Sequence, residues 1–293
     1  MLTRIIFILF YLLHFLPLPV LHLLAYPLGY LAYFTLSKRR RIGMINLRLC
    51  FPEKSQRERR SMLYTNFYHM AAMFLEYSFC WYASAQRIKR YVHVEGEEYL
   101  YQAAKCHQHV LLLCPHFCAF ELSALRLNLH HPLISIFTRQ KDPVWNQRLY
   151  DGRTRFNTLH HVHLIRRNEK IISIIHLLKN SSALFLYLPD QDFGRKDSIF
   201  VPFFGIPTAT TTGVSRLSCL TKRHVIPMIS IRHFGRLQIK IFPPCEHFPT
   251  TDISADTTRI NQLIEHLIRQ HPTQYFWLHQ RFKTRPPGEK SVY

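Results

Sequence analysis

The segment LLLCPHFCAFE, residues 111–121, decides how the rest of the chain is interpreted. It begins with an apolar run that is typical of a buried strand, and this run stops at Pro115. The next two ionisable groups, His116 and Glu121, are so spaced that on one continuous helix they would point about 140° apart. If His116 lies on a strand-to-helix turn and Glu121 lies inside the following helix, both can face the crevice at the carboxyl end of the strand. Open α/β sheets bind their ligands in that crevice.

The composition indicates a folded protein with an anionic partner. Of 293 residues, 47% are hydrophobic, which excludes a disordered chain and allows a large core. The 38 Lys and Arg residues outnumber the 18 Asp and Glu residues, so the formal net charge is +20. Nucleic acid, an anionic membrane surface and an acidic protein all fit this charge. The seven cysteines are odd in number and several lie in apolar runs, so we expect them to be reduced.

The amino-terminal residues predict membrane attachment. Residues 5–36 contain no Asp, Glu, Lys or Arg and are long enough to cross a bilayer. A cleaved signal peptide is the alternative, but the stretch is too long and has no clear small-residue cleavage site. Residues 38–41 read KRRR, so the positive-inside rule places the rest of the chain in the cytoplasm. Prolines at positions 17, 19 and 27 leave open whether the segment spans the membrane or bends within one leaflet.

The next segment is strongly basic. Residues 38–60 contain nine Lys and Arg residues against Glu53 and Glu58, with apolar residues at helical spacing. This pattern predicts a basic amphipathic helix that lies on anionic headgroups, and a solvated run of charge is the alternative. Ser55 and Glu58 have the spacing of a capping box, which predicts that a helix starts there and continues to about Phe79.

Beyond residue 91, short apolar runs alternate with amphipathic segments, and this alternation predicts an α/β domain with a mixed, largely parallel sheet flanked by helices. The expected strands cover residues 91–94, 110–114, 133–137, 162–165, 183–188, 224–231 and 237–242. The expected helices lie near residues 97–105, 117–129, 143–154, 168–179, 208–221 and 256–270. We therefore divide the chain into a membrane segment (1–37), a region of basic and aromatic helices (38–90) and an α/β domain (91–293).

His116 and Glu121 could carry acid–base chemistry. A neutral imidazole can take a proton from a hydroxyl, and a nearby carboxylate can hold its tautomer and stabilise the imidazolium. Such a pair would serve direct transfer of an acyl group to an alcohol. On its own, however, an H-x4-E spacing favours the alternative that His116 is one of 19 histidines with no special role. Cys114 and Cys118 invite a metal or a thiol nucleophile, but no further ligand pair has recognisable spacing, so we predict buried cysteines and no metal.

A second group of polar residues follows a later strand. The sequence LYLPDQDFGR, residues 186–195, ends a predicted strand with Asp190 and Asp192, and an apolar, proline-bounded loop and a threonine-rich helix start follow. This could be an ordinary connection, yet it falls at the same predicted edge as His116, and Arg166 reaches that edge too. The apolar loop could line an acyl chain, and the helix start could face an anionic group.

Several short motifs occur in order along nearly the whole chain: RRRI (39–42), NL (46–47), CFPE (50–53), PH (115–116) with Glu121, PDQDFG (189–194), FVPFF (200–204), YFWLH (275–279) and RFKTRP (281–286). Together they resemble the late acyltransferases of lipid A assembly, the lauroyl/myristoyl transferase family of Gram-negative bacteria. That family is itself similar to the glycerolipid acyltransferases, so the resemblance implies their α/β fold behind a membrane-anchoring helix. The combined motifs reverse the preference for a histidine without a role.

The resemblance implies transfer of a fatty acyl group, lauroyl or similar, from acyl-carrier protein to the 3-hydroxyl of a hydroxyacyl chain on a Kdo-bearing lipid A precursor. His116 would be the base and Glu121 its orienting carboxylate. Arg166, Asp190, Asp192 and Arg195 would bind substrate or support activity. No cofactor is implied beyond the acyl-carrier thioester. The implied location is the bacterial inner membrane with its anionic lipids, with the catalytic domain facing the cytoplasm.

Two other functions stay open from the sequence. The chain departs from the broader glycerolipid group, which has an Asn-His motif and a Pro-Glu-Gly-Thr type motif where this chain has Pro115-His116 and PDQD (189–192), and this puts a glycerol-phosphate acceptor in doubt. Acylation of a lysophospholipid or of another lipid-linked glycan is the enzymatic alternative. A basic membrane- or nucleic-acid-binding module is the alternative without catalysis, but no motif for RNA or DNA binding accompanies the charge, so we expect no nucleic-acid partner.

Overall fold

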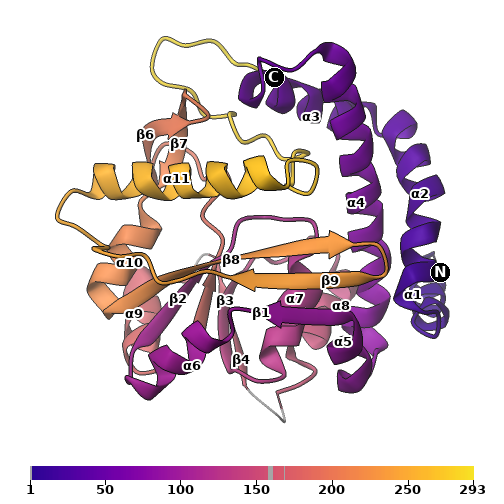
Figure 1. Ribbon diagram of the computed structural model, residues 1–293, viewed down its shortest axis with the longest axis horizontal. Coiled ribbons are helices and arrows are strands. Elements are labelled where there is room, and N and C mark those ends of the chain that lie inside the picture. The colour runs from indigo at the N-terminus through magenta and orange to yellow at the C-terminus, as the bar shows by residue number, and fades with distance from the viewer. Residues whose placement is uncertain (1, 158–160, 168) are drawn as a thin grey trace.

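The computed structural model describes residues 2–157, 161–167 and 169–293. Its centre is a seven-stranded sheet with the strand order β1-β9-β8-β2-β5-β3-β4, in which every neighbouring pair is parallel except β8 and β9 (Figure 1). The predicted mixed, largely parallel sheet is therefore confirmed. The strands are β1 (Val92–Glu95), β2 (His109–Leu113), β3 (Leu133–Phe137), β4 (Val162–Arg166), β5 (Leu184–Tyr187), β8 (Arg223–His233) and β9 (Arg236–Ile241).

Strand β2 is a continuous apolar run because both faces of the sheet are covered. Successive side chains of a strand point to opposite faces. Accordingly, Leu112 packs into one hydrophobic cluster, while Leu111 and Leu113 pack into the other. The first cluster contains apolar residues of α6 (Glu98–Lys105) and α7 (Phe120–Asn128). The second contains those of α9 (Ile171–Lys179), α10 (Gly213–Thr221) and α11 (Ile253–Gln270).

The amino-terminal third is helical. Its helices are α1 (Leu2–Leu13), α2 (Leu18–Thr35), α3 (Ser37–Cys50), α4 (Gln56–Tyr82) and α5 (Ala85–Tyr91). The long helix α4 begins at the predicted capping box, in which Ser55 accepts a hydrogen bond from the Glu58 amide and Glu58 accepts one from the Ser55 amide. Helix α4 packs against α1, α2, α7 and α8 (Pro143–Thr154), so it joins the amino-terminal helices to the sheet (Figure 1).

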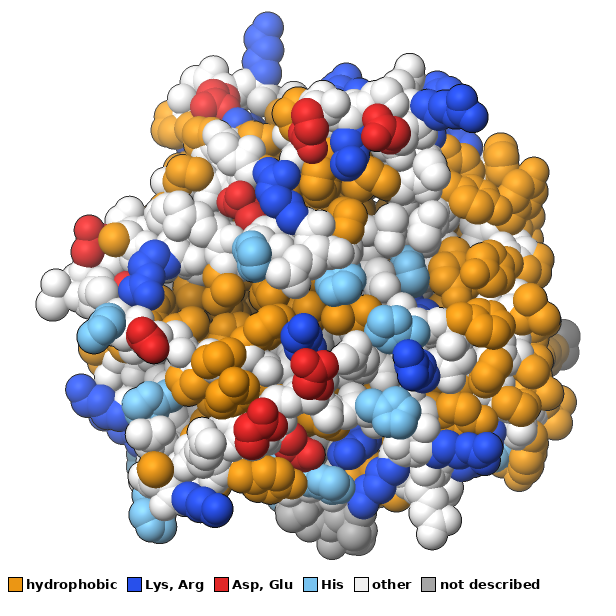
Figure 2. Space-filling model, viewed as in Figure 1, with side chains coloured by type: hydrophobic (Ala, Val, Ile, Leu, Met, Phe, Trp, Pro, Cys, Tyr) orange, Lys and Arg blue, Asp and Glu red, His pale blue; other side chains and the backbone are white. Residues whose placement is uncertain are grey.

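The apolar amino-terminal stretch forms two helices rather than one. The chain turns after α1, and Pro17 and Pro19 lie at the start of α2, where a proline has no intrahelical hydrogen bond to lose. Within the described residues, α2 is the one helix that is long and apolar enough to cross a bilayer, and 28% of that span is buried. Hydrophobic side chains gather on the side of the molecule where α1 and α2 lie (Figure 2). This surface suggests membrane anchoring.

The structure corrects two predicted helices. The basic segment 38–60 is not one helix, because α3 ends at Cys50 and α4 begins at Gln56. Residues 208–211, expected to open a helix over 208–221, belong to β7 (Ile206–Thr211), which pairs with β6 (Ser198–Phe203) in a separate two-stranded sheet. The connecting residues Phe204 and Gly205 both have positive φ, as the tight turns of hairpins require. The threonines at 208, 210 and 211 are β-branched and favour this strand, so α10 begins only at Gly213.

Candidate active site

Two adjacent parallel strands bring the first candidate residues together. Strands β2 and β5 are paired with Leu113 opposite Tyr187, and the Cys114 amide donates to the Tyr187 carbonyl at 3.0 Å. A proline ends each strand, at Pro115 and Pro189, and the next residues are His116 and Asp190. Because the carboxyl ends of parallel strands meet at one edge of the sheet, both side chains reach the same place.

Asp190 holds His116 through two hydrogen bonds. The backbone amide of His116 donates to Oδ2 at 2.8 Å, and the ring Nδ1 lies 2.7 Å from Oδ1. Since a carboxylate oxygen accepts, Nδ1 of the neutral ring carries the proton and Nε2 is left as a base. Burial opposes the ionisation of Asp190, but His116 and its hydrogen bonds outweigh burial and lower the pKa of Asp190 below its ordinary value. The geometry therefore provides an oriented imidazole.

Glu121, expected as the orienting carboxylate of His116, has a different partner. It lies buried in the first turn of α7 and forms a two-pronged pair with Arg153 of α8, whose Nε is 3.1 Å from Oε2 and whose Nη2 contacts Oε1. Tyr77 of α4 donates to the same carboxylate at 3.3 Å. Although burial opposes its charge, Arg153 has a pKa raised above the ordinary value by Glu121. Glu121 is thus neutralised by an arginine and does not contact His116 in this structure; its role in activity remains a prediction.

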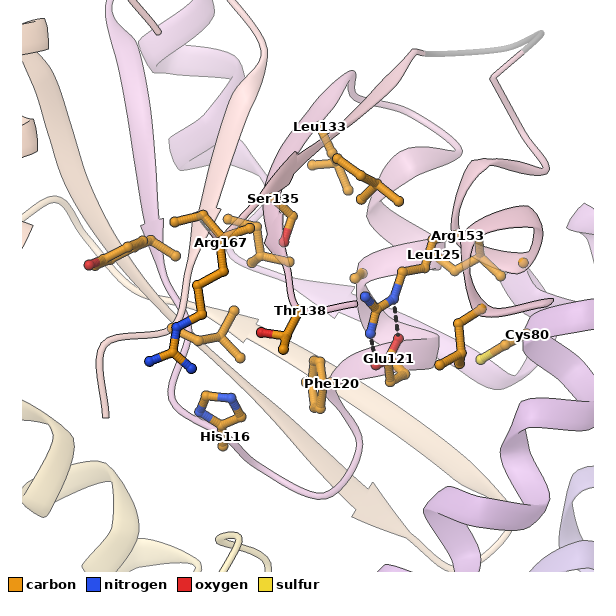
Figure 3. A pocket seen from close by; sticks show the side chains of 18 of the residues that line it. Cys80, His116, Phe120, Glu121, Leu125, Leu133, Ser135, Thr138, Arg153 and Arg167 are labelled. Carbon is orange, nitrogen blue, oxygen red and sulfur yellow. Dashed lines mark hydrogen bonds and ion pairs between the residues drawn. The ribbon is translucent and has the colours of Figure 1, made fainter. Parts of the chain in front are cut away.

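His116, Glu121 and Arg153 all line one cavity of about 380 Å³ (Figure 3). Polar residues and apolar residues share its wall. The polar lining includes Ser135, Thr138, Gln140, Arg167, Gln191 and Asp197, and the apolar lining includes Trp81, Phe120, Leu125, Leu133, Leu149, Leu164 and Leu188. The helices α4, α7 and α8, the strands β3, β4 and β5 and the loops that follow these strands supply most of these side chains. The cavity can accept a molecule with an apolar chain and place a polar group beside His116.

Of the two arginines at the end of β4, only the second lines the cavity. Arg166, predicted to support activity, is exposed and does not line the cavity. The next residue, Arg167, lines the cavity, and its guanidinium lies 4.5 Å from the centre of the Phe193 ring. Consecutive side chains of a strand point to opposite faces of the sheet, so neighbouring residues can have different surroundings. No contact tests the predicted supporting role of Arg166, which stays a prediction.

Asp192 and Arg195 contact the carboxyl-terminal segment and do not line the cavity. The carboxylate of Asp192 accepts hydrogen bonds from the Thr284 amide at 2.7 Å and from the Thr284 hydroxyl at 2.8 Å. Arg195 is exposed and donates to the Arg285 carbonyl at 3.0 Å. In this structure both residues hold the segment that follows α11.

That segment in turn holds the loop that carries His116. The Phe276 amide donates to the His116 carbonyl at 2.9 Å, and Tyr275 forms an isolated β-bridge with Phe117. His279 accepts from the Asp192 amide at 3.2 Å. Burial and the nearby His116 lower the pKa of His279 to about 4, so this ring is a neutral acceptor at pH 7. The motif over 275–286 therefore holds the loops that carry His116 and Asp192 in place.

Helix α3 also holds this carboxyl-terminal segment in place. The amide nitrogen of Asn46 donates to the carbonyls of Trp277 at 2.7 Å and His279 at 2.8 Å. Arg153, Arg167, Tyr77 and Asn46 were all missed as site residues from the sequence. Asn46 belongs to the NL motif at 46–47, but its contact with the carboxyl-terminal segment depends on tertiary packing, and no local pattern marks the other three.

Cys114 and Cys118 are buried packing residues. Burial raises the pKa of the Cys114 thiol well above its ordinary value and raises that of Cys118 to about 12. Neither thiol is therefore available as a thiolate nucleophile at neutral pH. Among the residues that the structure describes, no group of three or more His, Cys, Asp or Glu side chains is arranged to hold a metal ion.

Comparison with known proteins gives the class of protein. Residues 1–284 match the family model described as bacterial lipid A biosynthesis acyltransferase. The chain is 34% identical over 281 residues to the lipid A biosynthesis palmitoleoyltransferase of Escherichia coli (strain K12), a match that covers 95% of this chain and 90% of that protein. The lauroyltransferase of the same organism gives the same identity and coverage. Its myristoyltransferase is 30% identical over 263 residues, which cover 88% of this chain and 79% of that protein.

Together with the α/β fold, these matches define the protein as an acyltransferase. The chain belongs to the bacterial lipid A biosynthesis acyltransferase family, and its reaction is a step of lipid A biosynthesis. The equal identity to a palmitoleoyltransferase and a lauroyltransferase does not distinguish the acyl chain that it transfers.

Proposed function

We propose that this protein transfers a fatty acyl group, lauroyl or similar, from acyl-carrier protein to the hydroxyl of a hydroxyacyl chain on a Kdo-bearing lipid A precursor. The observation that carries the proposal is the oriented imidazole: His116 is held through its Nδ1 by Asp190 and lines a cavity whose wall has both polar and apolar parts. The names of the relatives, which are lauroyl-, myristoyl- and palmitoleoyltransferases, support a long-chain donor.

The reaction needs one proton transfer in each direction. Nε2 of His116 takes the proton of the acceptor hydroxyl while the hydroxyl oxygen attacks the thioester carbonyl carbon. The tetrahedral intermediate collapses, the carbon–sulfur bond breaks, and the leaving thiolate takes the proton from the imidazolium. The products are the new ester and a free thiol. Asp190 stabilises the imidazolium that forms between the two transfers, because its carboxylate is already ionised.

The Glu121–Arg153 pair suits a supporting role. Its charges cancel inside the cavity wall, and it ties α7 to α8, whose residues Leu125 and Leu149 line the apolar part. We propose that this part receives the acyl chain and that its depth sets the preferred chain length. The phosphorylated acceptor and the acidic carrier protein are both attracted by a protein of net charge +20, so the transfer rate should fall as salt rises.

We propose that the catalytic domain faces the cytoplasm at the inner membrane. The apolar face of α1 and α2 supports attachment, and the basic residues that follow α2 favour the cytoplasmic side. A cytoplasmic site would have access to acyl-carrier protein, whereas the membrane face would bring the site to an insoluble acceptor.

The proposal is tested with purified protein, labelled acyl-carrier protein and lipid acceptor. We expect His116→Ala to lower the rate of transfer by at least about 10³-fold, because it removes the base. The matched control is His224→Ala, since His224 is exposed at the opposite end of the sheet. Transfer by His116→Ala at near the wild-type rate would refute the role of His116.

The same assay separates acceptors and donors. A lysophospholipid is offered beside the lipid A precursor, and preferential acylation of the lysophospholipid would contradict the proposed acceptor. Carrier proteins loaded with chains of different length identify the preferred donor. Mass spectrometry of lipid A from cells with and without the gene then shows which hydroxyacyl chain is acylated.

A further inference from the structure

A second cavity lies between α3 and the beginning of α4. It has a volume of about 660 Å³ and shares no lining residue with the cavity at His116. Met44, Ile45 and Val292 give it apolar walls, and Tyr33 lines it at the end of α2. Five arginines line it as well, at positions 40, 41, 48, 59 and 60, and no acidic residue does. We call this feature the arginine groove.

The positive charge of the arginine groove is not neutralised within the protein. Arg40 donates to the Tyr33 carbonyl at 3.1 Å, and Arg59 donates to the Phe51 carbonyl at 3.0 Å, so both are oriented by uncharged partners. The other three arginines of the groove, 41, 48 and 60, are exposed. Over the described part of the chain, no carboxylate lies within ion-pair distance of any of the five. Like charges gathered in one groove repel each other, and a bound anion offsets that repulsion.

The arginine groove lies where an apolar surface ends. Tyr33 packs against Tyr64 and Phe67 of α4, and Tyr30, Leu31 and Phe34 are exposed on the last turns of α2. Figure 2 shows hydrophobic side chains along the side formed by α1 and α2, and Lys and Arg side chains toward the end where Figure 1 labels α3. An apolar strip that runs into a cluster of arginines matches a lipid, with its tails beside the strip and its headgroup in the groove.

We propose that the arginine groove binds the phosphate of a membrane lipid whose acyl chains lie along α2. Guanidinium groups bind phosphate oxygens through paired hydrogen bonds, so several arginines around one groove fit a phosphate better than a diffuse surface charge does. The opposite side of α3 holds the site, because Asn46 donates to the carbonyls of Trp277 and His279. A lipid in the groove thereby sets the height of the His116 cavity above the membrane. This binding does not depend on acyl transfer.

The experiment uses the full-length protein in detergent micelles that contain a tail-labelled fluorescent phosphatidylglycerol, and binding is measured by fluorescence anisotropy. Tail-labelled phosphatidylcholine is the zwitterionic reference. The groove variant is Arg41→Glu with Arg60→Glu. The control variant is Lys38→Glu with Arg57→Glu, which changes the net charge equally on the same two helices but lies outside the groove lining. All four side chains are exposed, so neither variant should unfold, and thermal unfolding verifies this.

We expect the wild-type protein to prefer phosphatidylglycerol, and we expect the groove variant to bind it at least about tenfold more weakly, with less than about a twofold change in the control. Equal loss in both variants would show diffuse attraction to charge and would overturn the proposal. Lack of preference over phosphatidylcholine would overturn it as well, and so would full displacement by millimolar inorganic phosphate, since free phosphate would then be the ligand. Repeating the measurement with His116→Ala separates this result from the proposed catalysis, because binding should be unchanged.

Discussion

His116 has a defined orientation because one carboxylate contacts both its backbone amide and its ring. Asp190 is buried, so these two hydrogen bonds satisfy an anion that would otherwise be costly to keep away from water. The carbonyl side of His116 is held as well, by the Phe276 amide. Glu121 has its own cation in Arg153. The site thus contains two acid residues with different partners, one beside the imidazole and one beside a guanidinium.

At this scale we predict that Asp190→Asn lowers the rate constant for acyl transfer by about 10²–10⁴-fold, because an amide can donate to Nδ1 and favour the wrong tautomer of His116. The apparent KM for the acceptor should change little, since Asp190 does not line the cavity. Steady-state kinetics over several acceptor concentrations give both quantities.

Glu121→Gln is the contrasting variant. It leaves Arg153 charged and incompletely paired, so it should lower the free energy of unfolding, by about 3–5 kcal/mol if the pair is lost altogether.

For the Asp190→Asn variant, activity at the wild-type level would show that the imidazole of His116 does not need the Asp190 carboxylate.

Among the elements, α2 and α4 pack unusually closely. Gly29 of α2 faces the backbone of Tyr68 of α4, and a Cβ built on Gly29 would lie 2.8 Å from the Tyr68 Cα atom. Backbone atoms cannot rotate away as a side chain can. The glycine therefore permits the contact, and the contact keeps the apolar face of α2 in place beside the site-bearing domain (Figure 1).

We predict that Gly29→Ala lowers the free energy of unfolding by about 1–3 kcal/mol, because α2 must move away from α4 to make room. Thermal unfolding in detergent measures the effect. Leu31→Ala is the control, since Leu31 is 58% exposed on the same helix and should change stability little. Wild-type stability of Gly29→Ala would contradict the close approach of the two helices.

Across the whole molecule, the buried ion pair of Arg232 and Glu76 links the amino-terminal helices to the site. Arg232 of β8 makes two hydrogen bonds of 2.7 Å with Glu76 of α4. Arg232 also donates to the carbonyl of Cys118, at 2.6 Å, in the loop after His116. Glu76 in turn lies 2.9 Å from the ring of His22 in α2. Burial opposes both charges, but each partner favours the charge of the other, so the pKa of Glu76 is lowered and that of Arg232 is raised.

We predict that Arg232→Met lowers the free energy of unfolding by about 3–5 kcal/mol, because the Glu76 carboxylate is left buried without its cation. The double variant Arg232→Met with Glu76→Leu should be more stable than the single variant, since it leaves no unpaired charge. Arg236→Met is the control, because Arg236 is exposed at the start of the adjoining strand β9. Thermal unfolding of the wild-type protein and the three variants measures these differences in stability. A double variant less stable than Arg232→Met would contradict the explanation.

The sequence by itself determined the strands of the main sheet, most of the helices and the motif residues. Apolar runs and alternation predicted all seven strands of the main sheet: β5 is apolar throughout because both faces are covered, whereas β9 alternates between buried and more exposed residues. The capping box predicted the start of α4, and the proline after β2 predicted that His116 lies at the edge of the sheet. The hairpin of β6 and β7 was missed because its threonines also fit a helix start, and only pairing with β6 decides between the two.

Only the tertiary structure decided which charges meet. His116 and Glu121 are neighbours in sequence, yet the carboxylate on His116 comes from Asp190, 74 residues away, because β5 lies next to β2 in the sheet. Arg153 lies on α8 and Glu121 lies on α7. The two residues meet because both helices pack against α4 in the same hydrophobic cluster. Local spacing specifies helices and strands through backbone geometry, whereas partners across the site depend on strand order and helix packing, which no short segment encodes.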